Sequence, residues 1–352
     1  MVATYLRLLA WPTGQNLEWD LPVARSLGEA SLGSGLALAA LASGAAAAWW
    51  WSRRRAGATA AAVRVAAFGV AFFFLALLPT SSVVPLDDLL MEHRVYLASF
   101  GIFLAVAVVG ERAARFEVPP WATASAVAAV LLSLALALHA RNAVWETRFA
   151  LAADSAAKSP RKARPHVNLG HALDERGDYE GALREYGLAL AHSGGAPKNE
   201  ALVLRNLSAT LAHLGRWGEA EEALRRAASR SPDSAEVQEN LAAVRARLGD
   251  LDGAEEAARR AIALSPAAGT AFQVLGLVRL ERGDATGAVE PLERATRAAP
   301  EDGARWINLA VAYARAGRRV DACDALRKAA ESGGGLAQEA QRRASAAGCP
   351  AP

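Results

Sequence analysis

The sequence has few of the residues that usually carry metal binding or catalysis. Its 352 residues include two Cys and six His, and none of them falls into a cluster with the spacing of a metal site. It also has no Gly-rich phosphate loop and no Ser-His-Asp arrangement of the kinds known from enzymes. The composition therefore predicts no metal site and no cofactor of the chain's own.

Neither basic nor acidic residues are in large excess. The formal net charge is only +3, and from Ala163 onward the basic and acidic residues nearly cancel. A nucleic-acid-binding face needs clustered Lys and Arg to neutralise phosphates, so nucleic acid is not an expected partner. The N-terminal segment lacks the apolar core and the small-residue cleavage site of a signal peptide. We therefore expect no cleaved leader.

Long apolar runs are present, but they are confined to the first part of the chain. A membrane-spanning helix needs about 20 apolar residues to cross a hydrocarbon core of about 30 Å. The segments predicted to span are residues 31–51, 62–83, 95–110 and 121–138. Tryptophans at the ends of two of these segments fit an interfacial aromatic belt.

Arginines between these segments predict the orientation of the chain in a membrane. The connection after the first segment carries Arg53, Arg54, Arg55 and Arg64, and the one after the third carries Arg112 and Arg115. Because cytoplasmic loops carry an excess of basic residues, we expect both connections to be cytoplasmic. The N-terminal segment, the loop before the third span and everything after residue 140 then lie outside the cytoplasm. The expected location is a bacterial inner membrane, multi-pass, with the remainder of the chain on the periplasmic side.

The second half of the chain is an internal repeat. Gly, Ala and Pro each recur at intervals of 34 residues, as in Gly215, Gly249, Gly283 and Gly317. This is the period of the tetratricopeptide repeat (TPR), in which each unit is a pair of antiparallel helices. The predicted fold class is therefore all-α: a short polytopic transmembrane helix bundle followed by a TPR right-handed superhelical solenoid.

The predicted domains follow from these two patterns. They are an extracytoplasmic or interfacial segment (1–30), four transmembrane helices (31–140), a linker half-repeat helix (141–162), five TPR repeats (163–335) and a capping helix with a tail (336–352).

One position of the first helix of each repeat is unusually rich in Asn. Asn168, Asn206, Asn240 and Asn308 occupy it, and Val274 interrupts the row. A row of amides can donate hydrogen bonds to a peptide backbone and accept them from it, and it resembles the asparagine ladder of O-GlcNAc transferase. The predicted partner is an extended or unfolded polypeptide. The alternative is that Asn is merely common and solvated at this position.

A cluster of ionisable residues precedes the third predicted span. Asp87, Asp88, Glu92, His93 and Arg94 lie within eight residues of one another. Charged side chains at a membrane boundary usually face a cavity, a partner or lipid headgroups. The alternative is a solvated loop with a salt bridge at the start of a helix. We expect no general-base pair at Asp87 and Asp88, because adjacent residues point in different directions.

The order of these parts resembles the C-terminal part of the transmembrane-and-TPR O-mannosyltransferase family, in a bacterial relative. The resemblance is carried by Glu92, Arg94, Tyr96, Leu97 and Ser99, which are similar to the family's E-R-x-x-Y-L-P-S-like segment. The register is shifted by one residue, and Ala98 stands where Pro is expected.

The resemblance implies a glycosyltransferase that takes a sugar from a polyprenyl-phosphate donor and transfers it to Ser or Thr of a protein. It makes Glu92, His93, Arg94 and Tyr96 candidates for contacts with the lipid phosphate of the donor. The family's acidic catalytic loop has no counterpart before Ser31, so the chain is expected to lack the N-terminal catalytic spans.

Two hypotheses follow. The chain is a membrane-anchored module whose groove binds polypeptide, alone or for a separate catalytic subunit, or it is part of an active protein O-mannosyltransferase. The two cysteines, Cys323 and Cys349, are either a disulfide or two separate thiols, because the sequence does not give their geometry.

Overall fold

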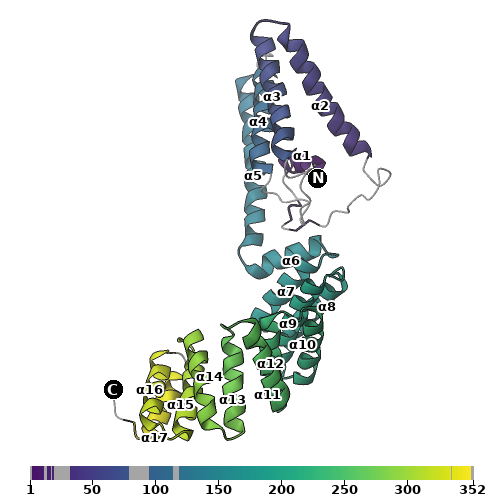
Figure 1. Ribbon diagram of the computed structural model, residues 1–352. Helices are drawn as coiled ribbons and strands as arrows, with labels where there is room; N and C mark the ends of the chain where they lie inside the picture. Colours follow the sequence, from purple (N-terminus) through teal and green to yellow (C-terminus); the bar gives the residue numbers. More distant parts are fainter. Residues whose placement is uncertain are drawn as a thin grey trace. The chain divides into compact units, whose positions relative to one another are not determined.

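The computed structural model describes residues 2–11, 14–16, 18–19, 32–78, 95–113, 119–333 and 335–349. Every regular element in these ranges is an α-helix (Figure 1). The chain divides into two compact units, residues 1–165 and 166–352. The predicted all-α class is therefore confirmed.

The first unit contains the apolar helices. Its elements are α1 (Val2–Ala10), α2 (Leu32–Arg53), α3 (Ala58–Leu78), α4 (Val95–Ala113), α5 (Pro120–Trp145) and α6 (Arg148–Lys158). Among the described residues, three helices are long and apolar enough to cross a membrane: Ala58–Leu78, Val95–Arg112 and Trp121–Trp145. The fourth predicted span, at 31–51, forms the 22-residue helix α2. Helix α2 is not among these three, and the insertion of all four helices in a membrane stays a prediction.

Helices α3 and α4 pack closely because glycines face each other at their crossing. A Cβ atom built on Gly69 would overlap the carbonyl oxygen of Gly101, and a Cβ atom on Gly101 would overlap the carbonyl oxygen of Gly69. Small residues at such a crossing let two backbones approach, which is a common basis of helix association in lipid. The amphipathic helix α1 packs across this pair, where Tyr5 is buried against Phe73 and Ala98.

Helix α5 is longer than the span predicted for it. The sequence indicated an end near residue 138 and a linker from 141, but the helix continues to Trp145. The added residues contain no Gly or Pro to stop it. The linker helix is α6, which starts after Thr147, whose side chain accepts a hydrogen bond from the amide of Ala150.

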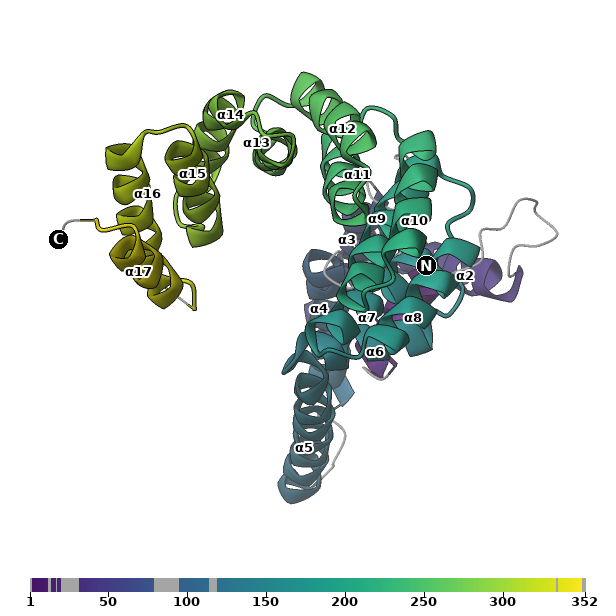
Figure 2. The same cartoon turned by 90° about the horizontal axis from the view of Figure 1, so that it is seen from below.

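The second unit is a stack of helix pairs that follow one another along a curve (Figure 2). The pairs are α7 (Ala163–Glu175) with α8 (Tyr179–Ala191), α9 (Pro197–His213) with α10 (Trp217–Arg230), α11 (Ala235–Leu248) with α12 (Leu251–Leu264), α13 (Gly269–Glu281) with α14 (Ala285–Ala298), and α15 (Gly303–Arg315) with α16 (Arg319–Glu331). Helix α17 (Ala337–Ala346) packs against α16.

The recurring Gly and Ala have separate roles in each pair. The Gly between the two helices has a positive φ, from 72° at Gly215 to 79° at Gly249 and Gly283, which other residues rarely adopt. The recurring Ala is fully buried at Ala220, Ala254 and Ala288, where a larger side chain would push the second helix away. The 34-residue pattern thus arises because each repeat contains one such turn and one such helix crossing.

One repeat depends on its neighbour for the start of a helix. The residue before α13 is Ala268, whose side chain cannot accept a hydrogen bond. Glu239 of α11 supplies the acceptor instead, at 3.1 Å from the amide nitrogen of Thr270 and 3.3 Å from that of Ala271. By contrast, α11 and α15 are capped by Ser234 and Asp302 of their own repeats.

Candidate functional site

The first helices of successive repeats form the inner layer of the second unit. Helix α11 contacts both α9 and α13, and α13 also contacts α15. A hollow of about 780 Å³ lies between α11, α13 and α15. Its lining includes Ala243, Val274, Leu277 and Asn308. The groove expected from a TPR solenoid therefore contains a recessed pocket in the third to fifth repeats.

The four asparagines of the predicted row are accessible. Asn168 is exposed, and Asn206, Asn240 and Asn308 are partly exposed. Within the described part of the chain, none of these four side-chain amides forms a hydrogen bond. Their donors and acceptors are therefore available to a ligand. Val274, which interrupts the row, is 5% exposed and belongs to the buried core.

The predicted donor-phosphate cluster is described only in part. Glu92, His93 and Arg94 lie outside the described residues, as do Asp87 and Asp88. Tyr96 is in the first turn of α4 with 72% of its surface exposed. The neighbouring Ala98, which replaces the expected Pro, is fully buried under α1. The role of this segment stays a prediction.

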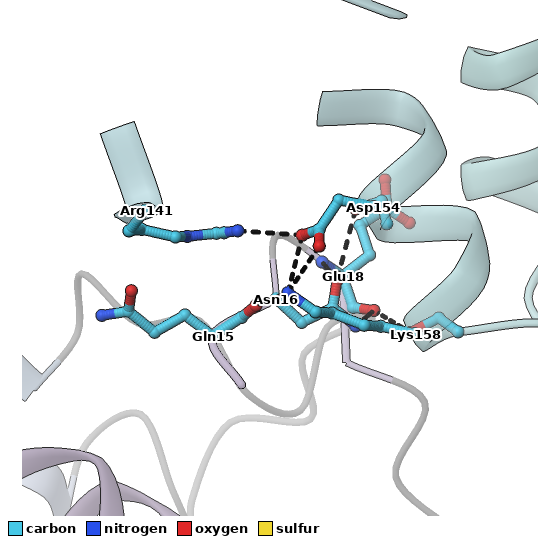
Figure 3. Close-up of polar contacts among 8 residues, drawn as sticks. Gln15, Asn16, Glu18, Arg141, Asp154 and Lys158 are labelled. Carbon is cyan, nitrogen blue, oxygen red and sulfur yellow. Dashed lines mark hydrogen bonds and ion pairs between the residues drawn. The ribbon is translucent and has the colours of Figure 1, made fainter. Parts of the chain in front are cut away.

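A polar junction in the first unit was not predicted. Asn16 is buried, and its side-chain nitrogen donates to the hydroxyl of Ser159 and to the carbonyl oxygen of Glu18, each at 2.7 Å. Its side-chain oxygen accepts a hydrogen bond from the hydroxyl of Ser155 at 3.3 Å. Figure 3 shows Asn16 and Glu18 beside Asp154 and Lys158, which belong to α6. The segment after α1 is therefore fixed to the linker helix, more than a hundred residues away in sequence.

The end of α5 is joined to the same junction. Asp154 of α6 lies 2.8 Å from Arg141 and 2.7 Å from Lys158, whose ammonium group also donates to the carbonyl oxygen of Gln15 (Figure 3). Burial alone would raise the pKa of Asp154, but the hydrogen bonds and charges of Lys158 and Arg141 outweigh it and lower the pKa. Asp154 is therefore ionised at neutral pH and connects Arg141, near the end of α5, to α6.

The two cysteines form a disulfide. Cys323 of α16 and Cys349, after α17, have Cα atoms 5.5 Å apart, a separation that a disulfide requires. The bond joins the segment after the capping helix to the last repeat. Of the two states left open by the sequence, the structure contains the bonded one.

The paired helices of the second unit form a TPR solenoid. The tetratricopeptide repeat family model matches residues 210–269 and 274–347. Among curated proteins, the chain is similar to protein O-mannosyl-transferase Tmtc3 of Drosophila melanogaster, at 31% identity over 163 residues. That match covers 46% of this chain and 17% of the Drosophila protein, so the chain spans about a sixth of its relative's length.

Solved TPR structures are similar to the second unit. A crystal structure of MamA has 26% identity and a TM-score of 0.41, and the match covers 51% of this chain and 94% of MamA. YrrB, described as a TPR protein with an unusual peptide-binding site, has 21% identity and a TM-score of 0.41, with 54% and 97% of the two chains covered.

Proposed function

We propose that this chain is a membrane-anchored TPR protein whose groove binds extended polypeptide on the periplasmic side of a bacterial inner membrane. The observation that carries the proposal is the row of unbonded amides at Asn168, Asn206, Asn240 and Asn308. A backbone in extended conformation exposes one donor and one acceptor per residue, and each amide offers two donors and an acceptor. Such a row binds backbone independently of sequence, as an acceptor-gathering domain requires.

Two features support the sidedness of the proposal. A disulfide between Cys323 and Cys349 persists in an oxidising compartment such as the periplasm and is rare in the cytosol. In addition, Arg112 at the end of α4 donates to the hydroxyl of Thr59 at 3.2 Å, so the end of α4 and the start of α3 lie at the same end of the helix pair. This agrees with one cytoplasmic side for both Arg-rich connections.

The binding test uses the full chain in lipid nanodiscs and an unfolded acceptor peptide. Replacing Asn206 and Asn240 together with Ala should weaken binding about tenfold or more, since each hydrogen bond is worth about 0.5–1.5 kcal/mol. Asn199→Ala is the matched control, because Asn199 is exposed in the first turn of α9 but outside the row. Equal affinity for the double variant and the control, with helicity unchanged, would remove the row from the account.

The orientation is tested by labelling with a membrane-impermeant thiol reagent. A cysteine placed at Arg54 should be protected in intact cells, whereas one at the exposed Asp233 in the repeats should react once the outer membrane is permeabilised. The reverse pattern would place the repeats in the cytoplasm.

A second candidate function is protein O-mannosyl transfer, and the similarity to Tmtc3 is the observation that favours it. In this proposal the chain is itself part of an active enzyme that uses a polyprenyl-phosphate sugar donor. Arg94 would hold the donor phosphate, and Tyr96 would lie at the headgroup level.

The transfer assay combines the purified chain, a radiolabelled polyprenyl-phosphate sugar and mixed periplasmic proteins. Label transferred by the native chain and lost in Arg94→Ala would establish the donor role. The absence of transfer by a chain that still captures peptide would leave the binding module alone.

A further inference from the structure

The amide row is interrupted in the fourth repeat, where an apolar residue replaces the amide. Asn240 and Asn308 occupy equivalent positions in the third and fifth repeats, and both are partly exposed. The equivalent residue between them is Val274, which is only 5% exposed. At this repeat the row therefore has no amide, and the side chain at the row position is packed into the core.

The hollow lies at this interruption. Leu251 of α12 and Val274 and Leu277 of α13 give it an apolar lining, and Ala243 adds only a methyl group on the α11 side. Its volume of about 780 Å³ is far larger than one missing amide would leave. Pockets that bind small organic molecules measure about 300–1,000 Å³, so the hollow has room for more than one side chain.

Polar groups line the same hollow. The amides of Gln273 and Asn308 line the hollow, and neither forms a hydrogen bond within the described part of the chain. Arg247 and Glu281 also line it and carry opposite charges. Amides together with an apolar lining match an extended peptide with apolar side chains. A lipid chain would leave the amides unpaired, and the opposite charges do not select a charged headgroup.

We propose that the hollow between α11, α13 and α15 selects extended polypeptides with apolar side chains at positions i and i+2. In an extended chain, alternate side chains point to the same face, so residues i and i+2 enter the hollow together while residue i+1 points away. Asn308 and Gln273 bind the backbone at the rim. This inference rests on the proposed function, to which it adds a preference for side chains.

The test compares two short peptides on the full chain in nanodiscs, with empty nanodiscs as the blank. In the first peptide Leu alternates with Gln, and in the second every Leu is replaced by Ser. Burying one large apolar side chain favours binding by about tenfold or more. The alternating peptide should therefore bind at least tenfold more tightly than the Ser peptide.

Two matched variants locate this preference. Ala243→Trp fills the hollow from α11 and should abolish the preference for the alternating peptide while the Ser peptide still binds. Ala209→Trp introduces the same side chain at the equivalent position of the second repeat, outside the hollow, and should leave the preference intact. Both positions are partly or fully exposed, so both variants should keep the native helicity, which circular dichroism checks.

The outcomes separate the two levels of the proposal. Equal binding of the two peptides by the native chain, or a preference that survives Ala243→Trp, would overturn the inference and leave backbone capture standing. Failure of both peptides to bind would overturn the proposed function itself. Alternating-peptide binding retained in full by Asn308→Ala would show an apolar ligand without backbone pairing and would also overturn the inference.

Discussion

Removing the disulfide should loosen the C-terminal end of the solenoid and leave the rest intact. Cys323 and Cys349 close a loop with a sequence separation of 26 residues. The chain-entropy relation gives about 3.5 kcal/mol for a loop of this length, lost when both cysteines become Ser. Because repeats contact only their neighbours, the loss should be confined to α16 and α17.

The loss should be visible as faster amide hydrogen exchange in α17. About 3.5 kcal/mol corresponds to a few hundredfold in the opening equilibrium, which sets the upper limit of the change in protection. Helices α9 and α10 of the same molecule are the internal control, because they lie far along the stack. Reducing agent should reproduce the effect in the native chain and add nothing to the double Ser variant.

Either of two results would refute this reasoning. Unchanged exchange in α17 after reduction would mean that packing alone holds the capping helix. Equal loss of protection in α9 and α17 would mean that the solenoid unfolds as a whole, so that nearest-neighbour energetics do not describe it.

Three further predictions concern packing, helix capping and pH. Gly69→Leu should lower the free energy of unfolding of the detergent-solubilised chain, measured by thermal unfolding, by about 1–3 kcal/mol or more, because the added atoms would overlap backbone atoms of α4. The control Gly44→Leu in α2 places its side chain in open space and should be nearly neutral. Glu239→Ala should cost about 1 kcal/mol through the lost acceptor for α13, measured by denaturant unfolding, and Glu239→Gln should recover most of it. Burial and the hydrogen bond to Glu293 raise the pKa of Tyr313 to about 12, so this hydroxyl contributes stability that is fully present below pH 10 and lost as the pH rises through 12. The phenolate absorbance that disappears in Tyr313→Phe should titrate near that value, and a midpoint near pH 10 would contradict the burial argument.

Local features of the sequence predicted the repeat unit because its constraints are local. Each recurring Gly is required by one turn with a positive φ, and each recurring Ala is required where two helices cross closely. Both requirements act within a single helix pair, so they leave a period in the sequence. The accessible face of the asparagine row follows from the same period, since a fixed register places equivalent residues on equivalent surfaces.

The polar junction and the hollow could not be predicted in this way. Asn16 donates a hydrogen bond to Ser159 across 143 residues, and neither local sequence indicates that the two residues are partners. The sequence did show that Val274 breaks the asparagine row, but not that the break lies over a cavity, because that depends on how three helices are spaced. The meeting of Gly69 with Gly101 likewise depends on the crossing of α3 and α4.

The hydrogen bonds from Glu239 to the start of α13 also bear on how such an array can be edited by recombination. A repeat that starts its own helix can be moved, duplicated or deleted as a cassette. The fourth repeat cannot be moved alone in this way, because Glu239 of the third repeat is the acceptor for its amides at Thr270 and Ala271. A crossover that excises the third repeat would leave α13 without that acceptor, so the third and fourth repeats should be inherited as one unit.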